Sequence, residues 1–177
     1  MRLVPAPLIL SATLVAGCIG PELGPDAAEL ANIRESNIVP KSSSTAFIRA
    51  FDKFCVKGAQ APAAKEALLR DAGYVPLRRV RNGVRSFVSD DRRPAVNFSD
   101  SLCMVQSRSR IGQTNQVRRY VQDTFPKAVA LGSGSGGHTF EETWMVTDTP
   151  KAMVGTSRTN DGGNHTKFAL IYFRPDS

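Results

Sequence analysis

The order in which helical and strand patterns follow one another constrains the fold of this chain more than any other feature. Residues 47–55 repeat apolar side chains at the spacing of one helical face, and a second helix is expected from Pro62 to Gly73. Beyond Gly73 the pattern changes to short alternating segments, interrupted by one helical stretch between Thr114 and Pro126. The chain therefore predicts two helices, a hairpin and a strand, a helix, and three further strands.

The predicted strands are separated by turn signals. Asn82-Gly83 divides segment 74–81 from segment 84–88, and this dipeptide is the strongest short-range hairpin signal. The last third predicts three strands, at 139–147, 151–159 and 165–174. The final strand is apolar on both faces, which favours a central position. We expect an α+β fold in which the helices pack on one face of an antiparallel sheet.

The first eighteen residues have the pattern of an export signal. Arg2 precedes an uncharged apolar stretch at 3–16, and the chain continues Leu14-Val15-Ala16-Gly17-Cys18. This sequence resembles the lipobox of bacterial lipoproteins, in which the cysteine thiol receives a diacylglycerol and the signal peptide is cut just before it. The resemblance implies a lipid on Cys18. An ordinary signal peptide with a chance cysteine, or a buried N-terminal strand, are the alternatives.

The resemblance also implies a domain organisation and a location. Residues 1–17 would be the signal peptide, 18–43 the lipidated cysteine and a flexible tether, and 44–177 one α+β globular domain. The protein would be exported and held at the bacterial membrane by its lipid, facing the periplasm. Ile19 stands where lipoproteins retained at the inner membrane carry Asp, which favours the outer membrane.

With Cys18 assigned to the lipid, Cys55 and Cys103 are the two remaining cysteines. An exported compartment is oxidising, so we expect them to form one disulfide that joins a helix to a strand. Such a bond would stabilise the fold by roughly 4 kcal/mol in the chain-entropy account. A pair of buried free thiols and a redox-active pair are the alternatives. No CxxC motif occurs, so a thioredoxin-like role is not expected.

Arginine is concentrated in one stretch of the chain. Residues 78–119 hold ten arginines, three acids and no lysine, which gives this window a formal charge of +7. Guanidinium groups suit bidentate contacts with phosphate or carboxylate. The predicted anion-binding face consists of Arg79, Arg81, Arg85, Arg118 and Arg119, with Val80 and Val84 turned toward the core. The alternative is an ordinary solvated polar face.

An exported protein meets a limited set of anions: lipid headgroups, lipid A phosphates and peptidoglycan carboxylates. Nucleic acid is not an expected partner, because the arginine window has few aromatic residues on which bases could stack. We therefore expect a small, non-enzymatic binding module, lipid-anchored in the cell envelope. Its partner would be an anionic envelope component or another protein.

The competing hypothesis is an envelope hydrolase that uses His138 or His165. His138 precedes Glu141 and Glu142, and His165 follows Asp161, so each histidine has an acid nearby. Neither belongs to an HExxH or G-x-S-x-G motif, and no metal site is predicted. The segment 132–137 formally contains G-x-G-x-x-G, but a strand pattern follows it, so we interpret it as a flexible loop and predict no cofactor.

Overall fold

The computed structural model describes residues 25–34, 38–109, 113–133, 140–148, 151–160 and 166–175. Its helices are α1 (Pro25–Asn32), α2 (Ser44–Phe51), the π-helical turn η2 (Asp52–Val56), α3 (Pro62–Asp71) and α4 (Thr114–Thr124). The strands are β1 (Val75–Pro76), β2 (Arg85–Val88), β3 (Ala95–Phe98), β4 (Leu102–Ser109), β5 (Val129–Gly132), β6 (Phe140–Asp148), β7 (Lys151–Asn160) and β8 (Thr166–Phe173). Of the helices in these ranges, none combines the length and apolar character that crossing a membrane requires.

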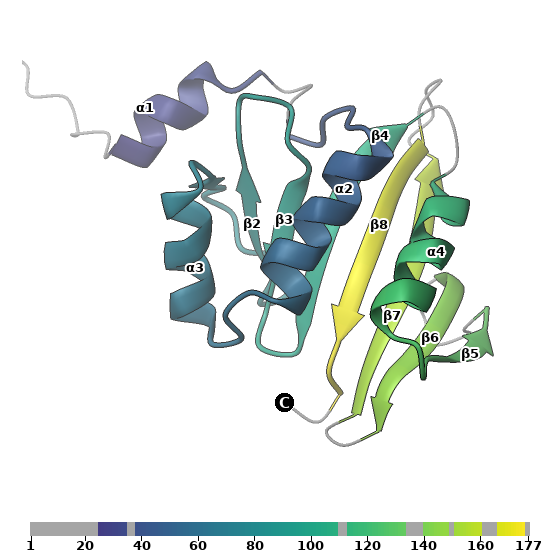
Figure 1. The fold of residues 1–177 in the computed structure, drawn as a ribbon. Coiled ribbons are helices and arrows are strands. Elements are labelled where there is room, and N and C mark those ends of the chain that lie inside the picture. Colours follow the sequence, from purple (N-terminus) through teal and green to yellow (C-terminus); the bar gives the residue numbers. More distant parts are fainter. Residues whose placement is uncertain are drawn as a thin grey trace, which may run out of the picture.

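The strands form one antiparallel sheet in the order β1-β2-β3-β4-β8-β7-β6-β5 (Figure 1). The fold is therefore mixed α+β, and the last strand, β8, lies between β4 and β7, as its apolar character on both faces predicts. The edge strand β5 has no counterpart in the sequence prediction. All four of its residues are exposed, so no alternation of buried and exposed side chains marks it.

The buried core joins the helices to the middle of the sheet. Phe47 and Phe51 of α2 belong to the same buried cluster as Phe98 of β3 and Leu170 of β8. The helical spacing of residues 47–55 reflects this packing, because it places large apolar side chains on one side of α2 and η2. The N-cap is Ser43, whose side-chain oxygen accepts a hydrogen bond from the amide of Ala46.

Helix α4 is fixed against α2 by one tyrosine. The ring of Tyr120 lies edge-on to the ring of Phe51, with the centroids 5.9 Å apart. Its hydroxyl donates to the carboxylate of Asp52 at 3.0 Å. Burial and this neighbouring carboxylate both raise the pKa of Tyr120, so the phenol is neutral at physiological pH. In Figure 1, α2 and α4 both cross in front of the strands.

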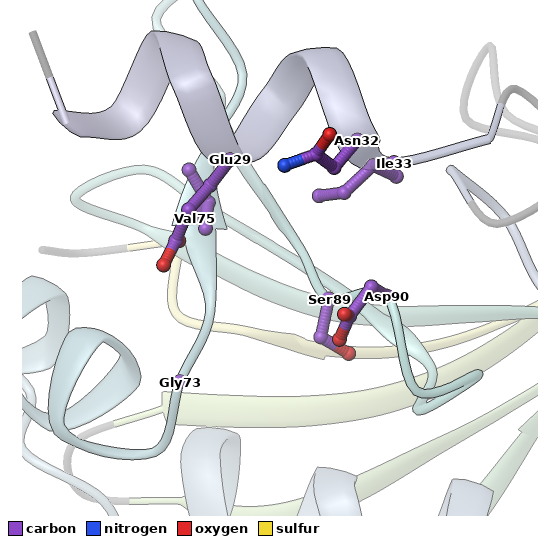
Figure 2. Close-up of a pocket in the computed structure, with 7 residues that line it drawn as sticks. All are labelled: Glu29, Asn32, Ile33, Gly73, Val75, Ser89 and Asp90. Carbon is purple, nitrogen blue, oxygen red and sulfur yellow. The ribbon is translucent and has the colours of Figure 1, made fainter.

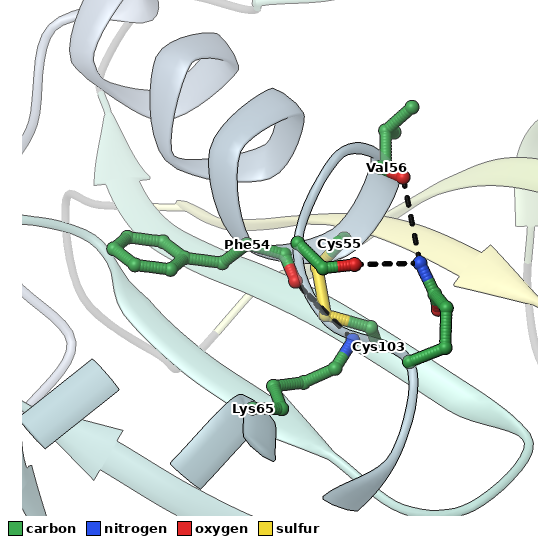
Figure 3. The surroundings of a disulfide bond; sticks show 7 residues. Phe54, Cys55, Val56, Lys65 and Cys103 are labelled. Carbon is green, nitrogen blue, oxygen red and sulfur yellow. Dashed lines mark hydrogen bonds between the residues drawn. A yellow bond between two sulfur atoms is a disulfide. The ribbon is translucent and has the colours of Figure 1, made fainter. Parts of the chain in front are cut away.

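A disulfide connects η2 to β4. Cys55 and Cys103 are bonded, with their Cα atoms 5.3 Å apart, and this is the pair that the sequence indicates (Figure 3). Both cysteines are buried within the core cluster. The bond therefore holds the end of the α2 and η2 helical segment on the sheet.

The folded part of the chain begins before Ser44, the predicted domain boundary. The carbonyl of Pro40 accepts a hydrogen bond from the amide of Arg108 at 2.8 Å, and Lys41 forms a parallel bridge with Arg108. The hydroxyl of Ser42 donates to the carbonyl of Arg92. Within the predicted tether 18–43, the residues just before Ser44 therefore pack on the domain and continue the sheet beside β4.

Candidate functional site

The Asn82-Gly83 hairpin turn decides where the first two predicted arginines point. Both central residues have positive φ, 50° at Asn82 and 74° at Gly83, which is the conformation of a type I′ turn. Arg81 and Val84 therefore face each other across the turn and exchange two backbone hydrogen bonds. Arg79 lies on the same side of the hairpin as Arg81 and Val84, because all three line one hollow.

This side of the hairpin borders a groove of about 560 Å³. Its floor is made by alternate residues of three strands, Val88 of β2, Ala95 of β3 and Met104 of β4. The neighbours of these residues, Phe87, Val96 and Val105, belong to the buried core. On strands β2, β3 and β4 the groove therefore occupies the opposite face of the sheet from the core.

Helix α1 adds a second hollow of about 450 Å³ beside the first. Ala27, Leu30, Ala31 and Ile33 line it, and the two hollows share the lining residues Ile38, Leu77 and Arg79. We call the two together the arginine-rimmed groove. Helix α1 contacts β1, and Figure 1 shows it outside the β2 edge of the sheet. An ion pair between Asp26 and Arg70 of α3, at 2.8 Å, ties it to the domain.

Three cations border this groove without a carboxylate partner. Arg78, Arg79 and Arg81 are exposed, and none of their guanidinium groups forms an ion pair or hydrogen bond with another residue of the described ranges. Among the residues that the structure describes, no Asp or Glu lines either hollow. The groove therefore combines an apolar surface with uncompensated positive charge at one end.

The other three arginines of the predicted face lie elsewhere. Arg85 points to the core side of β2, where it forms an ion pair with Glu66 of α3. Arg118 of α4 makes hydrogen bonds and an ion pair with Glu142 of β6, and this carboxylate raises the pKa of Arg118. Arg119 is exposed on α4. Strands β3, β4, β8 and β7 separate β2 from β6, so Arg118, which pairs with Glu142 of β6, does not share a surface with Arg79 and Arg81.

Two details of the sequence interpretation need correction. Val80 does not face the core and is 53% exposed, while Val84 lines the groove. Arg85 lies on the opposite side of the hairpin from Arg79 and Arg81. The two-residue turn explains the position of Arg85. It pairs residue 81 with residue 84, so residue 85 lies on the same side of the hairpin as residue 80.

Sequence reasoning missed the apolar part of the groove. The signal was present in β3 and β4, where consecutive rather than alternate residues are apolar, as in Ala95-Val96 and Leu102-Cys103-Met104-Val105. Such a run indicates that both faces of a strand are covered. On the groove face, Ile38 and Val39 border the hollow from the segment that precedes α2.

A smaller polar hollow of about 270 Å³ lies on the other side of α1 (Figure 2). Glu29 and Asn32 of the helix face Ser89 and Asp90, which follow β2. Its charge is opposite in sign to that of the arginine-rimmed groove. Within the described ranges no three His, Cys, Asp or Glu side chains are grouped so that they could hold a metal ion.

One cation is buried beside the disulfide (Figure 3). Lys65 of α3 is only 2% exposed, and its Nζ donates to the carbonyl of Phe54 at 3.2 Å. Burial, and secondarily the charge of Arg174, lower the pKa of Lys65 to about 8. This hydrogen bond satisfies a carbonyl near the end of η2, which is a structural role.

The remaining predicted sites, Cys18, His138 and His165, lie outside the described residues, as does most of the glycine-rich segment 132–137. The structure therefore places neither the lipidation site nor the histidines of the hydrolase hypothesis. Comparison with known proteins gives no match to a protein family, to a curated protein or to a solved structure.

Proposed function

We propose that this protein is a lipid-anchored binding module of the bacterial cell envelope. The lipobox pattern that ends at Cys18 supports the anchor, with export directed by residues 1–17. We place the domain in the periplasm, held at the outer membrane. We also propose that α2, α3 and α4 all cover the same face of the sheet, and that a ligand binds in the groove on the opposite face.

The ligand we propose is an anionic lipid of the envelope. One observation carries this proposal: the guanidinium groups of Arg79 and Arg81 have no ionic partner among the described residues and stand at the end of an apolar groove. An anionic headgroup would supply the missing charge, and the apolar part of the lipid would contact the partly exposed apolar side chains that line the groove. Lipid A shares this chemistry, whereas the carboxylates of peptidoglycan offer no apolar part. The arrangement requires no catalytic group, so we propose binding without catalysis.

Co-sedimentation with vesicles tests this function. A chain that starts at residue 19 lacks the anchor but keeps every residue of the described ranges. It should bind vesicles that contain phosphatidylglycerol and not vesicles of pure phosphatidylcholine. Binding should weaken between 0.02 and 0.2 M salt, because the Debye length falls to about 10 Å at 0.1 M. Equal binding to both vesicle types, or none to either, would contradict the proposal.

A further inference from the structure

We infer that the arginine-rimmed groove holds a single acyl chain, with its anionic end on Arg79 and Arg81 and its methylenes against the partly exposed side chains of Leu77, Val84 and Met104. This inference rests on the proposed function and makes it more specific. The inference assigns a defined site and one ligand class, a single-chain anionic lipid. Vesicle binding by itself would require only positive charge on the surface of the protein.

The floor of the groove suits an acyl chain better than a peptide. Strand β3 lies between β2 and β4, and its backbone groups on both sides are engaged in the sheet. An extended peptide laid on this floor would therefore find no free strand edge with which to pair. An acyl chain needs no hydrogen bonds, and it would remove water from the partly exposed side chains of Leu77, Val84 and Met104.

The polar residues of the floor do not oppose this occupant. Asn97 and Gln106 lie next to each other on β3 and β4, and the amide of Asn97 donates to the side-chain oxygen of Gln106 at 3.2 Å. The two side chains thus satisfy part of each other's hydrogen-bonding capacity. The volume of about 560 Å³ lies within the roughly 300–1,000 Å³ typical of small-molecule sites.

Charge sets the direction of the bound chain. The arginines stand at the hairpin end of the groove, and the carboxylates of Glu29 and Asp90 line a separate hollow on the other side of α1. An anionic end at the hairpin is attracted by the guanidinium groups of Arg79 and Arg81. The acyl chain would therefore run from the hairpin over the strands toward Ile38 and Val39.

Photo-crosslinking of the full chain in membranes tests this site. The probes are palmitate with a diazirine in its chain and the methyl ester of the same molecule, which lacks the charge. After irradiation, mass spectrometry should find the palmitate label on peptides that contain residues 84–106. The methyl ester should label these peptides at least fivefold less. Label spread over all exposed apolar residues, Val129 and Leu131 of β5 included, would overturn the inference.

Two variants with a matched control sharpen the result. Val84→Trp fills the groove, and Val80→Trp adds the same side chain on the opposite, exposed side of the hairpin. Groove labelling should fall at least fivefold in the first and stay unchanged in the second. The double variant Arg79→Gln/Arg81→Gln should remove the preference for palmitate over the methyl ester. Because it changes only exposed residues, it remains informative if Val84→Trp fails to fold.

Vesicle binding of the same variants separates this inference from the proposed function. Val80→Trp keeps both arginines and leaves the groove open, so its binding to phosphatidylglycerol vesicles should remain within about twofold of the unsubstituted protein. If vesicle binding persists but the groove peptides are not labelled, the acyl-chain site is wrong and the anionic-lipid function stands. If vesicle binding is also absent, the proposed function fails together with the inference.

Discussion

Arg81 lies directly opposite Val84 across the Asn82-Gly83 turn, and this pairing puts a cation and an apolar side chain on the same rim of the groove. The pairing depends on the positive φ of both turn residues. A turn of different length would rotate Arg79 and Arg81 to the other side of the hairpin. The local backbone conformation therefore controls the charge of the groove.

Replacement of Gly83 by alanine should destabilise this turn. At φ 74° an added Cβ meets no atom within 4 Å, so the cost arises from the left-handed backbone and not from a clash. For an L-residue this cost is about 1–2 kcal/mol. Urea unfolding should show that loss for Gly83→Ala and a smaller one for Gly83→Asn, since asparagine tolerates this conformation better. Equal stability of Gly83→Ala and the original protein would contradict the assigned turn.

The stability of the protein should increase with pH between about 8 and 10. Burial lowers the pKa of Lys65 to about 8 in the folded state, whereas an unfolded lysine titrates near 10.4. The unfolded chain therefore binds more protons in this interval, and the free energy of unfolding rises by about 2 kcal/mol. Above this interval Tyr74, whose pKa burial raises to about 12, acts in the opposite direction.

Lys65→Met is the control for this pH dependence, since it retains an unbranched buried chain without the amine. Urea unfolding at pH 8, 9 and 10 should give a nearly constant free energy for the variant. A rise of the same size in both proteins would show that another group causes it.

Removal of the Cys55–Cys103 disulfide should cost about 4 kcal/mol of stability, because it closes a long loop with a sequence separation of 48 residues. The double variant Cys55→Ala/Cys103→Ala tests this by urea unfolding. The intact mass of the original protein under non-reducing conditions should be lower than that of the dithiol by two hydrogen atoms. Alkylation of both cysteines without prior reduction would contradict the bond.

Much of the fold follows from local patterns. The first turn of α3 is indicated by Pro62, the hairpin by Asn82-Gly83, and the central place of β8 by its apolar residues on both faces. These signals act over a few residues, so they can be recognised without knowledge of the rest of the chain. The exposed strand β5 carries no such signal.

The candidate site was less predictable, because it depends on relationships between distant residues. Glu66 and Glu142 engage Arg85 and Arg118, and nothing near those arginines in the sequence reveals these partners. The segment 84–88 also contains Val84, Phe87 and Val88, which do not alternate, since both faces of β2 are covered. Its pattern alone therefore could not show on which side Arg85 lies.

The anchor makes a separate prediction. Cys18→Ser should move the protein from the membrane fraction to the soluble fraction or prevent its processing, because it removes the thiol that would carry the lipid. Fractionation followed by intact mass measurement distinguishes these results. A Cys18→Ser protein that is cleaved normally and still sediments with membranes would show that the lipobox interpretation is wrong.

The most direct test of the central claim compares two double variants for binding to phosphatidylglycerol vesicles at low salt. Arg79→Gln/Arg81→Gln removes the rim charges, and Arg49→Gln/Arg119→Gln removes two exposed arginines that have no ion pair within the described ranges. With about 1 kcal/mol for each arginine at an anionic membrane, the rim variant should bind roughly 30-fold more weakly. The control should stay within about threefold of the original protein, and equal loss in both variants would contradict a site at the groove.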